Sequence, residues 1–307
     1  MTDGMTDHIS VCICTFHRPR RLERLMRSIK AQRTEGLFEV STVIVDNDAQ
    51  GSAEEIATKL RRELDVPIDY AIELENTSPA ARNRALDMAR GNYIAIIDDD
   101  EFVPRHWLVT LFRAIGDYDV DGALGPVYPY YAQRPPRWVM KGRFGERPVL
   151  PTGTALNWDQ TRTGNVLLKR DVFDRHGLRF DLKWKTSGSD RAFFKAAMAL
   201  GYRFIAVKEA PAYETVPSAR WRKSYYFKRA LVQGYNTHKN IASDLHPLAQ
   251  ILLSLKLTAA TGVYAIALPF TLIMGTHGYG NVLERGGHHL SRLFAMFGIE
   301  LVKKRDF

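Results

Sequence analysis

The sequence contains few cysteines and no recognisable export signal. Only Cys12 and Cys14 occur in its 307 residues. They lie two positions apart in an apolar run, so in a strand both would point to the same face, where they cannot form a disulfide with each other. So sparse a pair indicates a reducing compartment and lacks the spacing of a cysteine metal site. The first eight residues are polar and acidic, so no positively charged n-region leads into an apolar h-region, and we therefore expect no secretion.

The sequence also lacks internal repeats, low-complexity tracts and an obvious flexible linker. Its length and its hydrophobic content of 45% suffice for one or two domains. The net charge of +9 favours anionic partners such as sugar nucleotides, lipid diphosphates or the cytoplasmic membrane leaflet. Nucleic acid would fit this charge too, but no binding motif and no basic–aromatic stripe is present, so we expect no nucleic-acid partner.

Strands and helices alternate through the first half of the chain. Apolar runs predict strands, and apolar residues at helical spacing predict helices. The predicted strands are 8–14, 40–45, 68–72 and 93–97, and the predicted helices are 20–32, 53–64 and 79–89. Run 93–97 has no polar alternation, which predicts a central strand buried on both faces. This order favours an α/β fold with a mostly parallel sheet flanked by helices, in which ligands bind beyond the carboxyl ends of the strands.

Polar residues follow three of the predicted strands at these carboxyl ends. Thr15 and Arg18 follow the first strand, Asp46 follows the second, and Asp98-Asp99-Asp100 follows the fourth. Adjacent carboxylates repel one another, and a divalent metal relieves that repulsion. Mg²⁺ and Mn²⁺ typically bind one or two carboxylates together with substrate phosphates. The triplet could also be a solvated turn or a helix cap, but its place after a buried strand favours a metal–diphosphate site.

Three further side chains are candidates with an ordinary structural alternative. Asp46 could bond a nucleobase or ribose, or it could shape the turn at 46–48. Arg82 lies near the start of the predicted helix 79–89, where it could bind phosphate, although a surface arginine is the commoner case. Asp190 lies just before the helix predicted over 192–200. It could be a general base that deprotonates an acceptor hydroxyl, or it could cap that helix.

The second half of the chain is less regular. Segments 122–131 and 163–169 predict strands. The stretch between them is rich in Trp, Pro and Arg, including Trp138, Arg143 and Trp158. Such a stretch could cover the site and hold a sugar against aromatic faces.

Six segments in this order resemble the family 2 glycosyltransferases, which have the GT-A fold. They are VCICTFHRP (11–19), VIVDNDAQGSA (43–53), ARNRAL (81–86), YIAIIDDDEFVP (93–104), TGNVLLKR (163–170) and SGSDRAFF (187–194). The likeness runs from about residue 9 to about residue 240 and is strongest to exopolysaccharide glucosyltransferases of the succinoglycan type. Each motif is moderately specific; their common order and spacing make the resemblance strong.

The resemblance implies roles for the donor-binding residues. Thr15, Arg18 and Asp46 would line the nucleotide pocket, and Arg82 would approach the nucleotide or its phosphates. Asp98 and Asp100 would be the two acids of an Asp-x-Asp motif that binds Mg²⁺ or Mn²⁺. Asp100 would be the direct metal ligand, Asp98 would face the ribose or the metal, and Asp99 would lie between them in the donor site.

The resemblance also implies the chemistry. Asp190 would be the catalytic base of an inverting transfer, and Ser189 replaces the Glu that usually precedes this Asp in the family. Lys228, Arg229 and His238 would belong to a segment that closes over the diphosphate. The implied reaction moves a hexose, glucose from UDP-glucose, to a lipid-linked oligosaccharide in bacterial exopolysaccharide synthesis. Two alternatives stay open: transfer of another sugar, such as rhamnose or galactose, and a catalytically silent sugar-nucleotide-binding subunit of a membrane assembly.

The carboxyl-terminal quarter contains an uncharged apolar run. Leu257–Val282 has no Lys, Arg, Asp or Glu and is long enough to enter a bilayer. Basic residues flank it on both sides, and Pro269 would allow a break in its middle, so we expect a re-entrant or interfacial segment with both ends cytoplasmic. A single span or a buried helix is the alternative. Leu290–Val302 predicts an amphipathic helix beside it.

These patterns predict two domains. Residues 1–240 would form the catalytic domain, with a nucleotide half at 9–115 and an acceptor half at 116–240. Residues 241–307 would form a tail that associates with the cytoplasmic face of the inner membrane.

Overall fold

The computed structural model describes residues 6–144, 146–185, 188–242, 246–271, 273 and 275–302. By contacts within the chain, it divides into two compact units. The first unit comprises Met1–Tyr130 and Arg147–Thr215, and the second comprises Tyr131–Glu146 and Val216–Phe307. The predicted catalytic domain, 1–240, thus extends into the second unit; its boundary as a functional domain stays a prediction.

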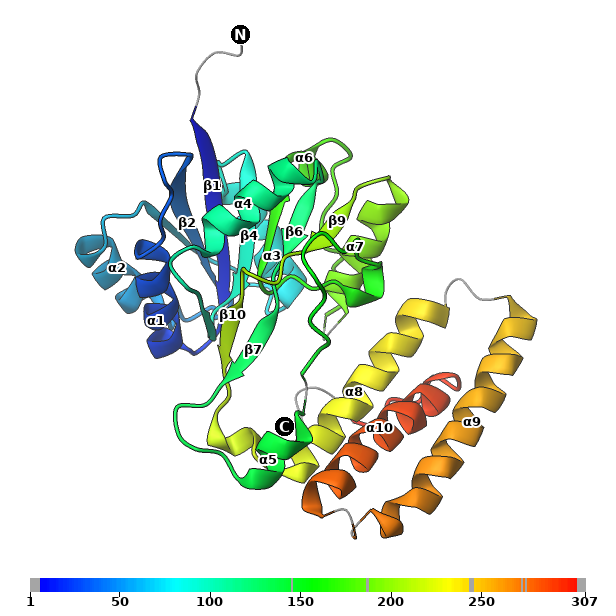
Figure 1. Cartoon of the computed structure of the whole chain (residues 1–307). Helices are drawn as coiled ribbons and strands as arrows, with labels where there is room; N and C mark the ends of the chain where they lie inside the picture. The colour runs from blue at the N-terminus through cyan, green and yellow to red at the C-terminus, as the bar shows by residue number, and fades with distance from the viewer. Residues whose placement is uncertain are drawn as a thin grey trace. The chain divides into compact units, whose positions relative to one another are not determined.

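A seven-stranded sheet in the order β3-β2-β1-β4-β8-β6-β9 forms the centre of the first unit (Figure 1). Its strands are β1 (Asp7–Thr15), β2 (Phe38–Asp46), β3 (Ile68–Ile72), β4 (Tyr93–Asp98), β6 (Gly122–Leu124), β8 (Val166–Lys169) and β9 (Phe204–Ala206). The first four strands of that order are parallel, β8 runs antiparallel to both β4 and β6, and β9 is parallel to β6. The predicted α/β fold with a mixed, mostly parallel sheet is confirmed.

Helices cover both faces of this sheet. They are α1 (Pro19–Lys30), α2 (Glu54–Glu63), α3 (Ser78–Met88), α4 (Trp107–Asp117), the short α6 (Asp171–Asp174) and α7 (Ser189–Ala199). Apolar side chains of α1, α2 and α4 pack on one face of the sheet, and those of α3 and α7 pack on the other. Strand β4 contributes Ala95 and Ile97 to the first core and Ile94 and Ile96 to the second. The prediction that this strand is buried on both faces is therefore confirmed.

The sequence of α1 explains why it forms and where it packs. Pro19 occupies the first turn, where its missing N–H costs nothing, and four apolar side chains recur at helical spacing. These side chains, Leu22, Leu25, Met26 and Ile29, are all buried. The helix therefore fixes the preceding loop, which carries Arg18, beside the end of β1.

A small second sheet joins β5 (Glu101–Phe102), β10 (Ala212–Thr215) and β7 (Val127–Tyr130). The prediction of one strand over 122–131 was wrong. The structure has two strands there, β6 and β7, because the chain leaves the main sheet at Gly125-Pro126. Pro126 cannot donate a ladder hydrogen bond. A Cβ atom at Gly125 would lie 1.9 Å from the carbonyl oxygen of Ala210, so only glycine fits this exit. The strand predicted over 163–169 begins only at Val166, since Asn165 has a left-handed φ of 62°.

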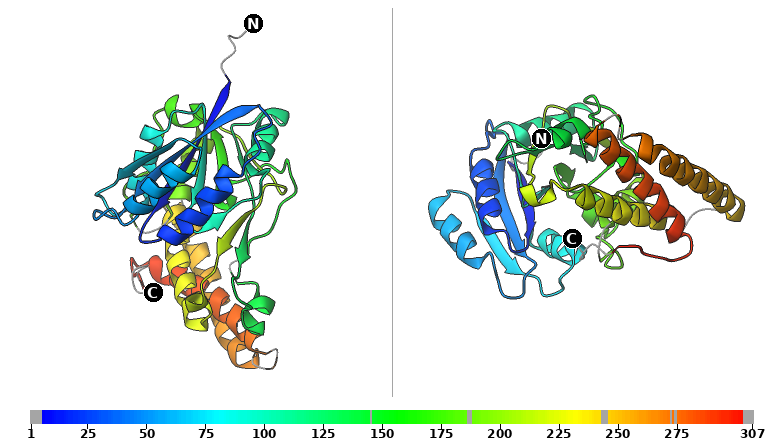
Figure 2. Two further views of the ribbon diagram at one scale, coloured as in Figure 1. Left: turned by 90° about the vertical axis from the view of Figure 1, so that its left-hand side faces the viewer. Right: turned by 90° about the horizontal axis from the view of Figure 1, so that it is seen from below.

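The second unit is helical. It contains α5 (Arg137–Gly142), α8 (Lys223–Ala242), α9 (Pro247–Phe270) and α10 (Thr276–Ala295). Helix α10 lies between α8 and α9 and packs against both (Figures 1 and 2). Glycines permit this close approach: a Cβ atom at Gly234 would lie 2.4 Å from the backbone oxygen of His288, and one at Gly287 would lie 2.8 Å from the Phe227 ring. The amphipathic helix predicted over 290–302 was wrong in its bounds, because the helix starts at Thr276 and ends at Ala295.

Helix α9 carries most of the predicted apolar segment. Leu248–Phe270 is the one helix among the described residues that is long and apolar enough to cross a bilayer, and almost none of it is buried. Pro269 lies in the last turn of α9, and α10 begins at Thr276, so the expected break in the middle of the segment 257–282 is confirmed. Because α9 and α10 pack side by side, they form a helical hairpin.

Candidate active site

The loop after β1 binds the acidic loop after β4. Thr15 Oγ1 donates a hydrogen bond to Asp99 Oδ2 at 2.9 Å. Arg18 donates to Asp99 Oδ1 at 2.8 Å and to Asp100 Oδ2 at 3.1 Å, and Arg21 reaches the same Asp100 oxygen at 3.3 Å. The structure thus brings four predicted donor-site residues together. Arg21 was missed by the sequence analysis, although it lies one helical turn after Arg18.

The carboxylate of Asp46 is enclosed by its own loop. It is fully buried and accepts hydrogen bonds from the backbone N–H groups of Ala53 (2.6 Å) and Asp48 (3.1 Å) and from the Tyr70 hydroxyl (3.1 Å). These bonds fix the turn that follows β2, which is the structural alternative considered for this residue. A nucleotide contact by Asp46 stays a prediction.

A cluster of carboxylates lies beyond the end of β4. We define the carboxylate cluster as Asp98, Asp100, Glu101 and Glu214. Glu101 and Glu214 are paired directly opposite each other across β5 and β10, where like charges destabilise a sheet. Glu101 is only 4% exposed, whereas the Asp98 side chain is 52% exposed. Asp98, rather than Asp100, is therefore the acid of the predicted motif that is open to solvent.

The electrostatics of this cluster favour a cation. Burial raises the pKa of Asp100 to about 7, and the charges of Glu214 and Asp98 add to the effect, while Arg18 opposes it. Burial raises the pKa of Glu101 well above its ordinary value, and Asp98, Asp100 and Glu214 raise it further. Burial and mutual repulsion therefore disfavour the ionised forms of Asp100 and Glu101, and positive charge nearby would relieve that cost.

The donor atoms around Asp98 fit a divalent metal shared with phosphate. Glu101 Oε2 is buried without a hydrogen-bond partner. A Cβ atom at Gly164 would lie 3.0 Å from Asp98 Oδ2 and 3.1 Å from Glu101 Oε1, so glycine keeps this space open. Within the described ranges, no group of three or more His, Cys, Asp and Glu side chains is arranged to hold a metal. Asp98 and Glu101 thus supply two carboxylates beside one open space, and metal binding there stays a prediction.

Arg82 connects the carboxylate cluster with the start of α7. Its Nη1 atom donates to Ser189 Oγ at 3.1 Å, and its Nη2 atom lies 3.9 Å from Asp98 Oδ1. Ser189 is the first residue of α7 and is buried. The guanidinium also lies over the Phe180 ring, 5.5 Å from its centroid. These contacts hold Arg82 at the edge of the sheet where phosphate would bind.

Asp190 lies in the first turn of α7, which begins after Gly188 in a left-handed conformation. The charges of Asp190 and of the carboxylate cluster both act on Arg162. Burial lowers the pKa of Arg162, and Glu101, Asp98, Glu214 and Asp190 all oppose that shift. The fold therefore brings Asp190 into the electrostatic neighbourhood of Asp98, about ninety residues earlier in the chain.

Several residues of this site were not found from the sequence. Glu101 directly follows the acidic triplet, so its position could have indicated it. Gly164 lies in one of the six family-like segments but was not itself indicated, and Arg162 and Glu214 come from segments with no local signal. These residues reach the site through the pairing of β8 with β4 and of β10 with β5.

The remaining candidates lie in different parts of the chain. Helix α8 of the second unit carries Lys228, Arg229 and His238. The segment 131–146, which also belongs to the second unit, carries Trp138 and Arg143. Trp158 lies in the first unit, where the Lys195 ammonium is 5.3 Å from its ring centroid. The irregular stretch predicted as one cover is thus divided between the two units.

Comparisons with known proteins identify the family of the chain. Residues 10–179 match the family model of glycosyl transferase family 2. The succinoglycan biosynthesis protein ExoM of Rhizobium meliloti (strain 1021) is 33% identical over 250 residues, which are 80% of this chain and 79% of the relative.

Solved structures of S. aureus TarS share the fold. Its residues 1–349 in complex with UDP-GlcNAc match with a TM-score of 0.54 at 16% identity, over 96% of this chain and 92% of that one. The complex with UDP matches with a TM-score of 0.51 over the same shares. The family match, the identity to ExoM and the GT-A fold together show that this chain is a glycosyltransferase that belongs to glycosyl transferase family 2.

Proposed function

We propose that the chain transfers glucose from UDP-glucose, with inversion, to a lipid-linked oligosaccharide in bacterial exopolysaccharide synthesis. The observation that supports this most directly is the half-exposed Asp98 beside the buried, unpaired oxygen of Glu101, next to three arginines, Arg18, Arg21 and Arg82. The likeness to a succinoglycan biosynthesis protein supports the pathway. The UDP and UDP-GlcNAc in the TarS complexes support a UDP-sugar donor.

The side chains would share the work as follows. Arg18, Arg21 and Arg82 would bind the donor diphosphate, and Asp98 with Glu101 would hold Mg²⁺ or Mn²⁺. A bound metal would offset the negative charge of the leaving diphosphate. Asp190 would take the proton of the acceptor hydroxyl as that oxygen attacks the anomeric carbon, so the transfer needs no sugar–enzyme intermediate.

The test is release of nucleotide from a panel of donors in the absence of an acceptor. UDP-glucose, UDP-galactose, UDP-GlcNAc and dTDP-rhamnose are each incubated with the protein in Mn²⁺ or in EDTA. We expect slow, Mn²⁺-dependent hydrolysis of UDP-glucose above the others. Preferred release from another donor would replace glucose by that sugar, and binding without hydrolysis of any donor would favour the silent-subunit alternative.

We also propose that α9 associates with the cytoplasmic face of the inner membrane. It exposes large apolar side chains along its length, among them Leu252, Leu255, Val263 and Ile266. Leu255→Glu combined with Ile266→Glu should abolish sedimentation with anionic lipid vesicles, while Lys59→Glu, a charge change in the first unit, should leave most of it. Labelling of an Asp306→Cys variant by a reagent confined to the periplasm would contradict a hairpin whose two ends are cytoplasmic.

A further inference from the structure

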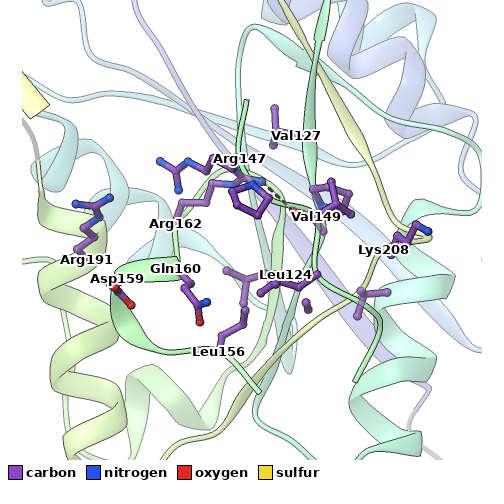
Figure 3. A pocket seen from close by; sticks show the side chains of 16 residues that line it. Leu124, Val127, Arg147, Val149, Leu156, Asp159, Gln160, Arg162, Arg191 and Lys208 are labelled. Atoms are coloured by element: carbon purple, nitrogen blue, oxygen red, sulfur yellow. Dashed lines mark hydrogen bonds between the residues drawn. The ribbon is translucent and has the colours of Figure 1, made fainter. Parts of the chain in front are cut away.

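A pocket with a basic lining lies beside the carboxylate cluster in the first unit. Its volume is about 300 Å³. Four of its lining residues are basic and one, Asp159, is acidic. We define the basic pocket by its four basic residues, which are Arg147, Arg162, Arg191 and Lys208. Leu124, Val149 and Leu156 supply apolar surface between them, as Figure 3 shows, with the three arginines on one side of Leu124 and Lys208 on the other.

The position of the pocket relates it to the predicted chemistry. It adjoins the ends of β6 and β9, and pairing places Leu124 of β6 level with Ile96 of β4 across Val166 of β8. The pocket therefore lies along the same edge of the sheet as Asp98, two strand spacings away, or roughly 10 Å. This distance of roughly 10 Å leaves room for about one sugar ring between the pocket and the diphosphate site.

Two residues join the pocket to the catalytic groups. Arg162 lines the pocket and also feels the charges of Asp98, Glu101 and Asp190. Arg191 lines the pocket and directly follows Asp190 in the first turn of α7. A molecule in the pocket would thus lie close to the turn of α7 that carries the proposed base.

We propose that the basic pocket is the acceptor subsite and that it takes a sugar ring carrying a negative charge, either a carboxylate or a phosphate. This inference rests on the proposed function. The lining carries four basic side chains and one carboxylate, Asp159, so its charge favours an anionic ligand, and arginines bind both anions through paired hydrogen bonds. The apolar surface of Leu124 and Leu156 suits the C–H groups of a sugar ring, and the volume is that of a small ligand site.

The test measures binding of three monosaccharides to the full-length protein by ligand-observed NMR. The probes are methyl β-D-glucuronide, glucose 6-phosphate and the neutral methyl β-D-glucoside. We expect at least one anionic probe to bind about tenfold or more tightly than the neutral one, since charge-assisted hydrogen bonds are stronger than neutral ones. Preference for the glucuronide would identify an acidic sugar, and preference for the phosphate would identify a phosphorylated one.

The variants locate the binding. Arg147→Gln combined with Lys208→Gln removes two pocket charges that lie outside the catalytic groups, and it should abolish the preference for the anion. The matched control, Arg90→Gln combined with Lys59→Gln, removes one arginine and one lysine charge elsewhere in the first unit. It should preserve the preference for the anion. Equal binding of all three probes, or a preference that survives in the pocket variant, would overturn the proposal.

A competition experiment separates the acceptor subsite from the donor site. The anionic probe should still bind when UDP and Mn²⁺ are present at saturation, because the two sites are adjacent. Displacement of the probe by UDP would place the pocket in the donor site and overturn the proposal. Nucleotide release without acceptor tests the proposed function alone, so a protein that binds the probe but hydrolyses no donor would fail that proposal separately.

Discussion

The carboxylate cluster and the basic pocket lie along one edge of the same sheet, yet the sequence encodes them in opposite ways. Three of the four carboxylates come from the four residues 98–101 at the end of β4, and Glu214 comes from β10. The four basic residues of the pocket come from four separate segments between residues 147 and 208. One site is thus a local motif at a strand end, and the other is assembled by the fold.

The difference agrees with the two functions that we propose for these sites. A diphosphate with its metal has a fixed charge and geometry, so a short motif after a buried strand can hold it. An acceptor varies in shape and charge, and loops on a fixed scaffold can be shaped to it. We therefore expect changes in the cluster to affect every donor reaction and changes in the pocket to affect the choice of acceptor.

The largest expected effect concerns Asp190, the proposed catalytic base. Asp190→Asn should lower the rate of transfer by roughly 10²–10⁴-fold, because an amide cannot take the acceptor proton. Binding of UDP-glucose, measured by calorimetry, should change little. Asp65→Asn, at a fully exposed side chain, is the matched control and should keep full activity. Full transfer by the Asp190 variant would remove it from the chemistry.

The second prediction tests whether the carboxylate cluster is built for a cation. Glu101→Gln should raise the melting temperature in EDTA, since it removes a buried carboxyl whose pKa is raised by burial and by neighbouring acids. The same variant should bind Mn²⁺ about tenfold more weakly.

The sign of this effect follows from linkage. A carboxyl with a raised folded-state pKa makes the folded state bind more protons than the unfolded state, so its stability falls as pH rises above the unfolded value near 4. The advantage of the Glu101 variant in EDTA should therefore grow between pH 5 and pH 8, and saturating Mn²⁺ should reduce it. A variant that is less stable than the wild type in EDTA at pH 8 would show that Glu101 has a structural role instead.

The third prediction concerns the pH dependence of the same cluster. The pKa of Asp100 is raised to about 7 by burial and by Glu214 and Asp98. Asp98 and Glu101 would hold a metal next to Asp100, and its charge would favour the ionised carboxylate, so affinity for Mn²⁺ should rise with pH up to about 7 and level off above it. Calorimetry at pH 6, 7 and 8 measures this, and equal affinity at all three values would show that the charge of Asp100 does not contribute to metal binding.

The comparison of the two sites also shows how far sequence reasoning reaches. The buried run Tyr93–Ile97 and the acids after it are local signals, and the structure confirms the strand and its place in the sheet. Helices α1 to α3 were predicted to within about two residues at either end, because each has apolar spacing and a clear start. Local patterns thus sufficed for the nucleotide half of the fold.

The parts that were missed depend on contacts between distant segments. The run 122–131 has the composition of one strand, but the crowding at Gly125 by Ala210 divides it between two sheets. Glu214 joins the site only because β10 pairs with β5. Likewise, nothing near Lys208 indicates that it shares a pocket with Arg147, because the two meet only in the folded chain.

The smallest expected effect concerns Ser189, which stands where the family usually has Glu. Its hydroxyl accepts a hydrogen bond from Arg82 at 3.1 Å, and it is buried. Ser189→Ala removes one hydrogen bond to a charged group while leaving Asp190 in place. We expect KM for the donor to rise roughly twofold to tenfold with kcat nearly unchanged, because Arg82 would be less well oriented toward phosphate.

Thr110→Ala is the matched control, since it removes a hydroxyl from α4 that bonds only the preceding turn, and it should leave KM unchanged. The two kinetic constants distinguish two roles for Ser189. A rise in KM alone means that the hydroxyl acts through Arg82 on the donor side of the edge. A fall in kcat comparable to that of Asp190→Asn would mean that Ser189 orients the base instead. Ser189 would then act on the acceptor side of the site, through Asp190, rather than on the donor side alone.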